Sequence, residues 1–163
     1  MGYDPLVVSE EQFTPPSVLN ELRLETIQSA RIKLAVETGK LKIHTPSNRS
    51  LERIESASRQ VGDFVALSQT DKDVLALVWE LSGSSFSPQL VSDDYAVQNV
   101  AEFLGFGYVS LTTFGIRYRF GWISYCPACR RKYAATESRN AVCEVCGTRL
   151  KRRVVKKEAV RKK

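Results

Sequence analysis

Histidine is almost missing from this chain of 163 residues, since His44 is its only one. Chemistry that passes a proton between two histidines is therefore excluded. His44 lies in the segment 41–45, whose apolar and polar residues alternate as they do in a strand. We therefore interpret His44 as a strand side chain and expect the reactive groups to be of other types.

Long apolar runs are missing as well. No stretch of about 18 apolar residues occurs, so we expect no membrane span and no membrane partner. The start of the chain, Met1-Gly2-Tyr3-Asp4, lacks the apolar stretch of a secretory signal. Reduced cysteines held by a metal are typical of the cytosol, which predicts a cytoplasmic protein.

Cysteine occurs at only four positions, in two Cys-x-x-Cys pairs: Cys126 with Cys129, and Cys143 with Cys146. Thirteen residues separate the two pairs, and Gly147 follows the second pair. This spacing is typical of a zinc ribbon, in which two tight turns bring four thiolates to one tetrahedral Zn²⁺ ion. Four thiolates leave no position for water, so we expect a structural metal. The alternative is two disulfides in a secreted domain.

Positive charge is concentrated in the C-terminal part of the chain. Residues 117–163 contain 15 Lys and Arg against 3 Asp and Glu, whereas residues 1–116 contain 9 against 15. A basic part of this kind suits a polyanion, and an acidic part suits cations such as metal ions. We expect residues 152–163 to form a basic tail that is disordered when free and that binds nucleic acid.

The hydrophobic patterns alternate between helix and strand from residue 13 to residue 111. This order predicts an α/β fold with a mostly parallel sheet. Thr70 is the expected cap of the most apolar helix, and Gly105 is the expected end of the last helix. The expected helices are 17–39 with a break near Leu24, 47–61, 71–81 and 95–104. The expected strands are a short one that ends at Phe13-Thr14, followed by 41–45, 90–92 and 108–111.

Acidic residues lie where strands give way to helices. Glu21 lies one turn into the first helix, Asp71 begins the apolar helix, and Asp93 and Asp94 directly follow the strand 90–92. Carboxylates that converge from separate elements suit Mg²⁺ or Mn²⁺, which prefer oxygen ligands. Three of these acids also have a plainer interpretation: an exposed helix residue for Glu21, a favourable helix N-terminus for Asp71 and a helix cap for Asp94.

Three runs of the chain resemble successive motifs of a PIN-type ribonuclease domain. They are Pro16-Ser17-Val18-Leu19-Asn20-Glu21-Leu22, Leu67-Ser68-Gln69-Thr70-Asp71 followed by Leu75-Ala76-Leu77, and Val91-Ser92-Asp93-Asp94-Tyr95-Ala96-Val97-Gln98-Asn99-Val100. Joined to the four-cysteine ribbon and the basic tail, they resemble the NIN-one-binding endoribonuclease family. Archaeal members of that family mature the end of the small-subunit ribosomal RNA.

The resemblance implies a PIN-like three-layer α/β/α sandwich with a parallel sheet, followed by a small zinc ribbon. It implies that Glu21, Asp71 and Asp94 are catalytic, metal-binding acids, with Asp93 close by. Mg²⁺ or Mn²⁺ would bind these acids, and Zn²⁺ would bind the thiolates. The implied enzyme is a metal-dependent endoribonuclease. Its implied substrate is the 3′ end of small-subunit precursor rRNA in the pre-ribosomal small subunit, cut between single-stranded nucleotides.

Four parts are expected along the chain: a PIN-like domain over 1–111, a linker over 112–122, a zinc ribbon over 123–151 and the basic tail. Family members usually begin with an apolar strand that carries the first catalytic aspartate, followed by a Gly-Tyr-Asp-Pro-like segment. Here that segment follows Met1 directly, so we expect the strand and its aspartate to lie upstream. The alternative is a degenerate PIN scaffold in a non-catalytic zinc-ribbon protein that binds RNA or ribosomes.

Cationic and aromatic residues are interleaved around the ribbon. This combination suits single-stranded RNA, because bases stack on rings and phosphates pair with cations. The alternative is that the rings form the core and docking surface of the ribbon, which is our interpretation of Trp122. A transcription factor that reads duplex DNA is not expected, because no recognition helix is predicted. The cations are Arg117, Arg119, Arg130, Arg131 and Lys132, and the rings are Tyr118, Phe120, Trp122 and Tyr133.

Overall fold

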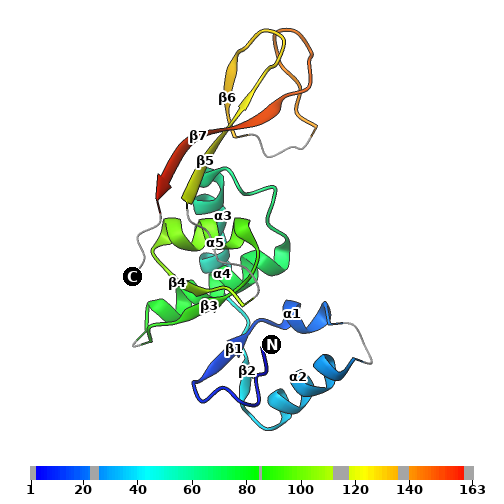
Figure 1. Ribbon diagram of the computed structural model, residues 1–163, viewed down its shortest axis with the longest axis vertical. Coiled ribbons are helices and arrows are strands. Elements are labelled where there is room, and N and C mark those ends of the chain that lie inside the picture. The colour runs from blue at the N-terminus through cyan, green and yellow to red at the C-terminus, as the bar shows by residue number, and fades with distance from the viewer. Residues whose placement is uncertain (1–2, 23–25, 85, 112–117, 136–139, 160–163) are drawn as a thin grey trace.

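The computed structural model describes residues 3–22, 26–84, 86–111, 118–135 and 140–159. Helices and strands alternate in the first part of the chain, and an antiparallel sheet follows (Figure 1). The described helices are α1 (Pro16–Asn20), α2 (Ile27–Glu37), α3 (Asn48–Val61), α4 (Gln69–Ser82) and α5 (Tyr95–Leu104). The described strands are β1 (Gln12–Thr14), β2 (Leu41–Ile43), β3 (Gln89–Val91), β4 (Gly107–Val109), β5 (Tyr118–Tyr125), β6 (Lys132–Ala134) and β7 (Lys151–Ala159).

The first four strands form parallel pairs, as the alternating order of elements predicts. β1 pairs with β2, and β3 pairs with β4. Parallel neighbours need a crossover connection, which α2 supplies for the first pair and α5 for the second. The α/β class is therefore confirmed. Within the described residues the two pairs are separate sheets, because no hydrogen-bonded ladder joins them. A cleft of about 800 Å³ is lined by residues of both β1 and β3.

The main hydrophobic core lies between α3, α4 and α5. Ile54, Leu75, Val97 and Val100 are fully or almost fully buried there, and Leu90 of β3 packs against them. Burying such side chains stabilises the fold by roughly 1.5–3 kcal/mol each. Across the described part of the chain, no helix has the length and apolar character needed to cross a bilayer.

Helix starts explain the main differences from the expected elements. Thr70 is not the cap of α4: Ser68 is, because its hydroxyl accepts the Asp71 N–H while the Asp71 carboxylate accepts the Ser68 N–H. The expected helix 17–39 is two helices, α1 and α2. Its expected break point, Leu24, lies outside the described residues. Gly105 ends α5 with a φ of 80°, as predicted.

The C-terminal sheet corrects two expected boundaries. Residues 118–122 are not a linker, and residues 152–159 are not a disordered tail, because they pair with each other in the antiparallel ladder of β5 and β7. β6 pairs with the other edge of β5. β7 is strongly basic, and basic residues such as Lys have little intrinsic preference for strands. Its extended conformation is maintained by the backbone hydrogen bonds to β5. Residues 112–117 and 160–163 of these segments lie outside the described part.

Candidate functional site

The four cysteines come together, as their spacing predicts. Their sulfur atoms all lie within 4.8 Å of one another. The Sγ atoms of Cys126 and Cys146 are 3.4 Å apart, and those of Cys129 and Cys143 are 3.5 Å apart. Four thiolates about 2.3 Å from a tetrahedral Zn²⁺ ion would be about 3.8 Å apart, so the donor set fits this metal. All four thiols are free, so the disulfide alternative is wrong.

Matching turns hold the two cysteine pairs. In the first turn, Arg130 N–H donates to the Cys126 carbonyl at 2.9 Å; in the second, Gly147 N–H donates to the Cys143 carbonyl at 2.8 Å. Arg130 and Gly147 occupy equivalent positions and both have positive φ angles, 61° and 69°. A glycine adopts this conformation without steric penalty, whereas an arginine does not.

Tyr133 supports the cluster in a way that the sequence did not reveal. Its hydroxyl lies 2.9 Å from Cys143 Sγ. This hydrogen bond lowers the pKa of the Cys143 thiol to about 6 and raises the pKa of Tyr133 to about 12. A hydroxyl that favours the thiolate prepares a metal ligand from outside the coordination shell. Tyr133 therefore belongs to the metal site as well as to the aromatic set of the ribbon.

Asp94 is the N-cap of α5. Its Oδ1 atom accepts the N–H groups of Ala96 at 2.7 Å and Val97 at 3.1 Å. Ser92 Oγ accepts the Asp94 N–H at 3.2 Å, which fixes the backbone before the helix. Asp94 Oδ2 has no hydrogen bond to any described residue. The helix cap therefore orients the carboxylate and leaves one oxygen for another ligand.

Asp71 lies in the first turn of α4 in a similar arrangement. Its Oδ2 atom accepts the Ser68 N–H and the Ser68 hydroxyl, both at 2.8 Å. Within the described part of the chain, Asp71 Oδ1 makes no hydrogen bond. Asp94 thus caps α5, and Asp71 takes part in the capping box of α4 behind its cap Ser68, as the plainer interpretations of a helix cap and a favourable helix N-terminus expected. Each acid keeps one carboxylate oxygen without a hydrogen bond to any described residue.

The other two predicted acids lie in different surroundings. Glu21 is exposed at the C-terminal end of α1. Asp93 Oδ1 accepts the Ser110 hydroxyl at 2.5 Å and the Leu111 N–H at 2.9 Å, which joins the ends of β3 and β4. Asp93 lines the 800 Å³ cleft, and so do Val18 and Leu19 of α1.

The structure does not gather the four acids as closely as the cysteines. Among the residues that it describes, the cysteine cluster is the one group of three or more His, Cys, Asp or Glu residues placed to hold a metal ion, and the four acids form no such group. The metal-binding role of Glu21, Asp71, Asp93 and Asp94 therefore stays a prediction.

The ribbon is fastened to the helical part through a buried carboxylate. Asp63 accepts hydrogen bonds from Asn99 Nδ2 at 2.6 Å and from Arg152 Nη2 at 2.9 Å. The Asn99 amide also bonds both backbone groups of Phe120 in β5. Arg152 stacks over the Trp122 ring, 4.5 Å from its centroid. These contacts confirm Trp122 as a docking residue, and they assign Arg152 to docking rather than to the free tail.

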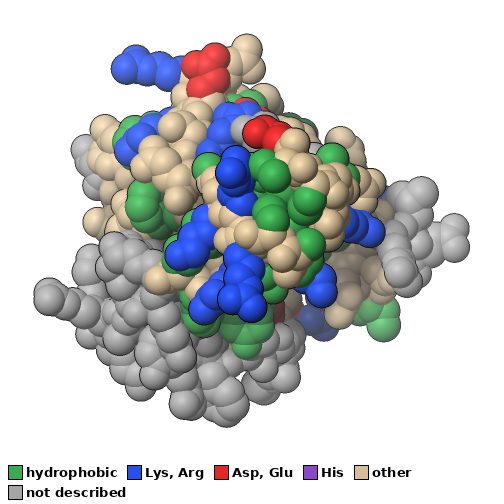
Figure 2. Space-filling model, turned by 90° about the horizontal axis from the view of Figure 1, so that it is seen from above, with side chains coloured by type: hydrophobic (Ala, Val, Ile, Leu, Met, Phe, Trp, Pro, Cys, Tyr) green, Lys and Arg blue, Asp and Glu red, His purple; other side chains and the backbone are tan. Residues whose placement is uncertain are grey.

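Seen from the ribbon end, the described surface is mainly basic. Lys and Arg side chains gather there among hydrophobic side chains, with few acids between them (Figure 2). Arg130, Arg131, Lys132 and Arg153 are all exposed. A basic and partly apolar surface of this kind suits a nucleic acid strand.

Comparison with known proteins gives consistent matches along the chain. A family model for the PIN domain of ribonuclease matches residues 6–81. The endoribonuclease Nob1 of Methanothermobacter thermautotrophicus is 35% identical over 152 residues, which cover 93% of this chain and 86% of the relative. The endoribonuclease Nob1 of Methanocaldococcus jannaschii is 33% identical over 162 residues, covering 99% and 77%. The ribonuclease VapC1 of Thermoplasma acidophilum is 30% identical over 149 residues, covering 91% and 71%.

Proposed function

Because the chain belongs to the Nob1 endoribonuclease family, we propose that it matures the 3′ end of small-subunit ribosomal RNA as a metal-dependent endoribonuclease. The observation that carries this proposal is the extent of the similarity, which includes both the α/β part and the ribbon. Membership of the family confirms the resemblance drawn from the motifs. The RNA that is cut, its place in the pre-ribosomal small subunit and the metal ions are the proposed elements.

The four thiolates would hold Zn²⁺ in a closed site. The distances between their sulfur atoms fit a tetrahedral ion. A closed site has no position for substrate, so its role is to keep the ribbon folded. The ribbon in turn presents a basic surface to RNA.

Glu21, Asp71, Asp93 and Asp94 would supply the catalytic acids. A divalent Mg²⁺ or Mn²⁺ ion bound by such carboxylates activates water and stabilises the charge that develops on a phosphodiester. The contribution of this chain is to orient the carboxylates. The capping box of α4 uses Oδ2 of Asp71, and the N-cap of α5 uses Oδ1 of Asp94. These hydrogen bonds fix the direction of the other carboxylate oxygen of each acid.

The proposal is tested with an RNA that spans the 3′ end of the small-subunit rRNA. The full-length protein is incubated with it in Mn²⁺ or Mg²⁺, and the products are mapped at single-nucleotide resolution. We expect one cut in the single-stranded region and none when divalent metal is withheld. An RNA of equal length with a shuffled end is the control. Cutting both RNAs equally would contradict the assigned substrate, and cutting neither would favour a non-catalytic RNA-binding protein.

A further inference from the structure

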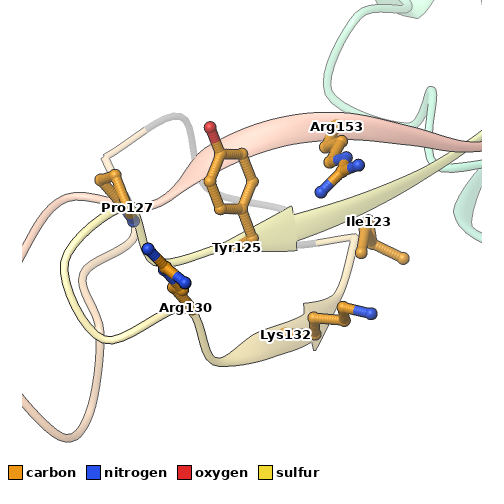
Figure 3. Close-up of a pocket in the computed structure, with 6 residues that line it drawn as sticks. All are labelled: Ile123, Tyr125, Pro127, Arg130, Lys132 and Arg153. Atoms are coloured by element: carbon orange, nitrogen blue, oxygen red, sulfur yellow. The ribbon is translucent and has the colours of Figure 1, made fainter.

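A pocket of about 390 Å³ lies on one face of the ribbon sheet (Figure 3). The strand registers explain which side chains form it. Ile123 lies opposite Arg153 of β7, and Tyr125 lies opposite Lys132 of β6. Alternate residues of a strand share a face, so these four side chains project from the same side of the sheet. The lining residues are Ile123, Tyr125, Pro127, Arg130, Lys132 and Arg153.

The opposite face of the sheet is already used for docking. Trp122 and Arg152 alternate with the pocket residues and contact α3 and its end. The consecutive pair Arg152 and Arg153 therefore serves two faces: Arg152 holds the ribbon to the helical part, and Arg153 points to the pocket. The pocket face is left for a ligand.

The pocket combines three cations with one aromatic ring. In the close-up, Tyr125 stands between Pro127 and Arg130 on one side and Arg153 on the other (Figure 3). Arg130, Lys132 and Arg153 form no ion pair with any residue that the structure describes. Three cations that have no ion-pair partner among the described residues, lying beside an aromatic ring, suit a ligand that has both negative charge and a flat aromatic group.

Arg130 stays in this pocket against a conformational preference. Its φ of 61° is the sole positive value among the described residues other than glycine. The equivalent position of the second cysteine turn is Gly147, which has a φ of 69° without strain. A ribbon turn therefore works with glycine at this position, and the arginine is not required by the fold. A strained residue whose side chain lines a pocket points to a function for that side chain.

We propose that this pocket binds one unpaired nucleotide of an RNA strand. The base stacks on Tyr125, and the phosphates on either side pair with Arg130, Lys132 and Arg153. A phosphate alone would not need the ring, and an acidic peptide would not fill its face with a flat group. The identity of the RNA rests on the proposed function, whereas the pocket itself is tested by binding alone.

The central test replaces Arg130 with glycine. Binding of a fluorescent single-stranded uridine oligonucleotide of about ten nucleotides is measured by anisotropy without Mg²⁺ or Mn²⁺. We expect Arg130→Gly to weaken binding about tenfold and to leave the melting temperature of the zinc-loaded protein unchanged or higher, because glycine relieves the strain. Unchanged affinity, or a lower melting temperature that accounts for the lost binding, would overturn the proposal.

Two lysines provide a matched control for charge. Lys132 and Lys151 both lie opposite Tyr125, on the two strands beside β5, and both are exposed. Only Lys132 lines the pocket. We expect Lys132→Ala to reduce affinity several-fold more than Lys151→Ala. Equal effects would mean that the face attracts RNA through its overall charge, and the pocket would then have no specific role.

Tyr125 separates stacking from charge. The oligonucleotide is compared with an abasic strand that carries the same phosphates. We expect the wild-type protein and Tyr125→Phe to prefer the strand with bases, and Tyr125→Leu to bind both strands equally. Equal binding of both strands by the wild-type protein, or equal competition by a polyglutamate peptide, would contradict the nucleotide assignment.

The two proposals fail in different ways. If the pocket variants bind RNA normally while the wild-type protein cuts its RNA, the pocket assignment is wrong and the proposed function stands. If the pocket variants lose binding while the wild-type protein cuts nothing, the pocket assignment stands and the proposed function is wrong.

Discussion

Single residues decide how the ribbon meets the helical part of this protein. Asp63 is only 5% exposed, and one of its carboxylate oxygens accepts a hydrogen bond from Asn99 while the other accepts one from Arg152. Both partners matter, because removing a partner of a buried carboxylate leaves its charge uncompensated. Gly62, next to Asp63, allows the close approach: a Cβ atom there would lie 2.8 Å from Trp122 Cβ.

The close approach at Gly62 gives a prediction with a built-in control. Gly62 and Gly105 have similar φ angles, 86° and 80°, but a Cβ atom on Gly105 would meet nothing within 4 Å. We expect Gly105→Ala to lower the free energy of unfolding by about 1 kcal/mol through backbone strain alone. Gly62→Ala should cost a further 1–3 kcal/mol or so, because it also overpacks the junction. Denaturant unfolding measures both, and equal losses would show that the junction is not tightly packed.

Sequence reasoning found the residues whose signal is local. The cysteine spacing gave the metal cluster, and the position of Asp94 before an apolar helix gave its cap. It missed Asp63 and Arg152, because their contact joins positions 89 residues apart and neither has a local pattern. Tyr133 was placed correctly in the ribbon, but its bond to Cys143 depends on how the sheet folds.

At the scale of elements, Glu80 links α4 to the start of α3. Its Oε1 atom accepts the Ser47 N–H and the Ser50 hydroxyl, both at 2.7 Å, and Oε2 lies 3.1 Å from His44 of the β2 end. Burial disfavours the charge, but the hydrogen bonds outweigh it and lower the pKa of Glu80 from 4.5 to about 2. The charged carboxylate therefore stabilises the helix start.

This pKa predicts how stability depends on pH. A carboxyl group with a lowered pKa stabilises the fold above its ordinary pKa, and the effect is lost as pH falls from about 4.5 toward 2. We expect Glu80→Gln to lower the free energy of unfolding at pH 7 by about 1–2 kcal/mol and to flatten its decline in this acid range. Urea unfolding between pH 2 and 7 measures it. A variant with the same acid dependence as the wild-type protein would contradict the assignment.

One strand, β7, could not be predicted from the sequence. The segment 152–159 is so basic that its composition indicated the start of a tail, yet it forms most of β7. Its partner strand, β5, lies about thirty residues earlier in the chain. The residue pattern of neither segment predicts that the two would pair. The caps Asp94 and Gly105 of α5 were predictable because capping needs residues only a few positions apart, whereas the cap of α4 was placed two residues too late, at Thr70 instead of Ser68.

At the scale of the whole molecule, the ribbon and the helical part have different sources of stability. The helical part has its own apolar core between α3, α4 and α5. The two faces of the ribbon sheet have different contacts. One face packs on the helical part through Trp122 and Arg152, and the other forms the pocket that Arg130 lines. The ribbon buries few side chains, among them Ser124, Cys126 and Cys143, so we expect its stability to depend on a metal bound by its four thiolates.

Metal removal should separate the two parts. Structural zinc contributes on the order of 10–16 kcal/mol in small zinc peptides. We expect a strong chelator to abolish the protection of β5, β6 and β7 in hydrogen exchange while α3, α4 and α5 stay protected. Added Zn²⁺ should restore the protection, and Mg²⁺ should not. Protection of the ribbon that survives complete loss of metal would contradict the structural role of the cluster.

The most direct test of the central claim is cleavage by Asp94→Asn. Asparagine caps a helix about as well as aspartate, so α5 should stay folded and the melting temperature should hardly change. The loss of a charged oxygen ligand should reduce metal-dependent cleavage of the small-subunit RNA end by about 100-fold or more. This result would support the proposed acidic centre. Cleavage at the wild-type rate by a well-folded Asp94→Asn protein would contradict it.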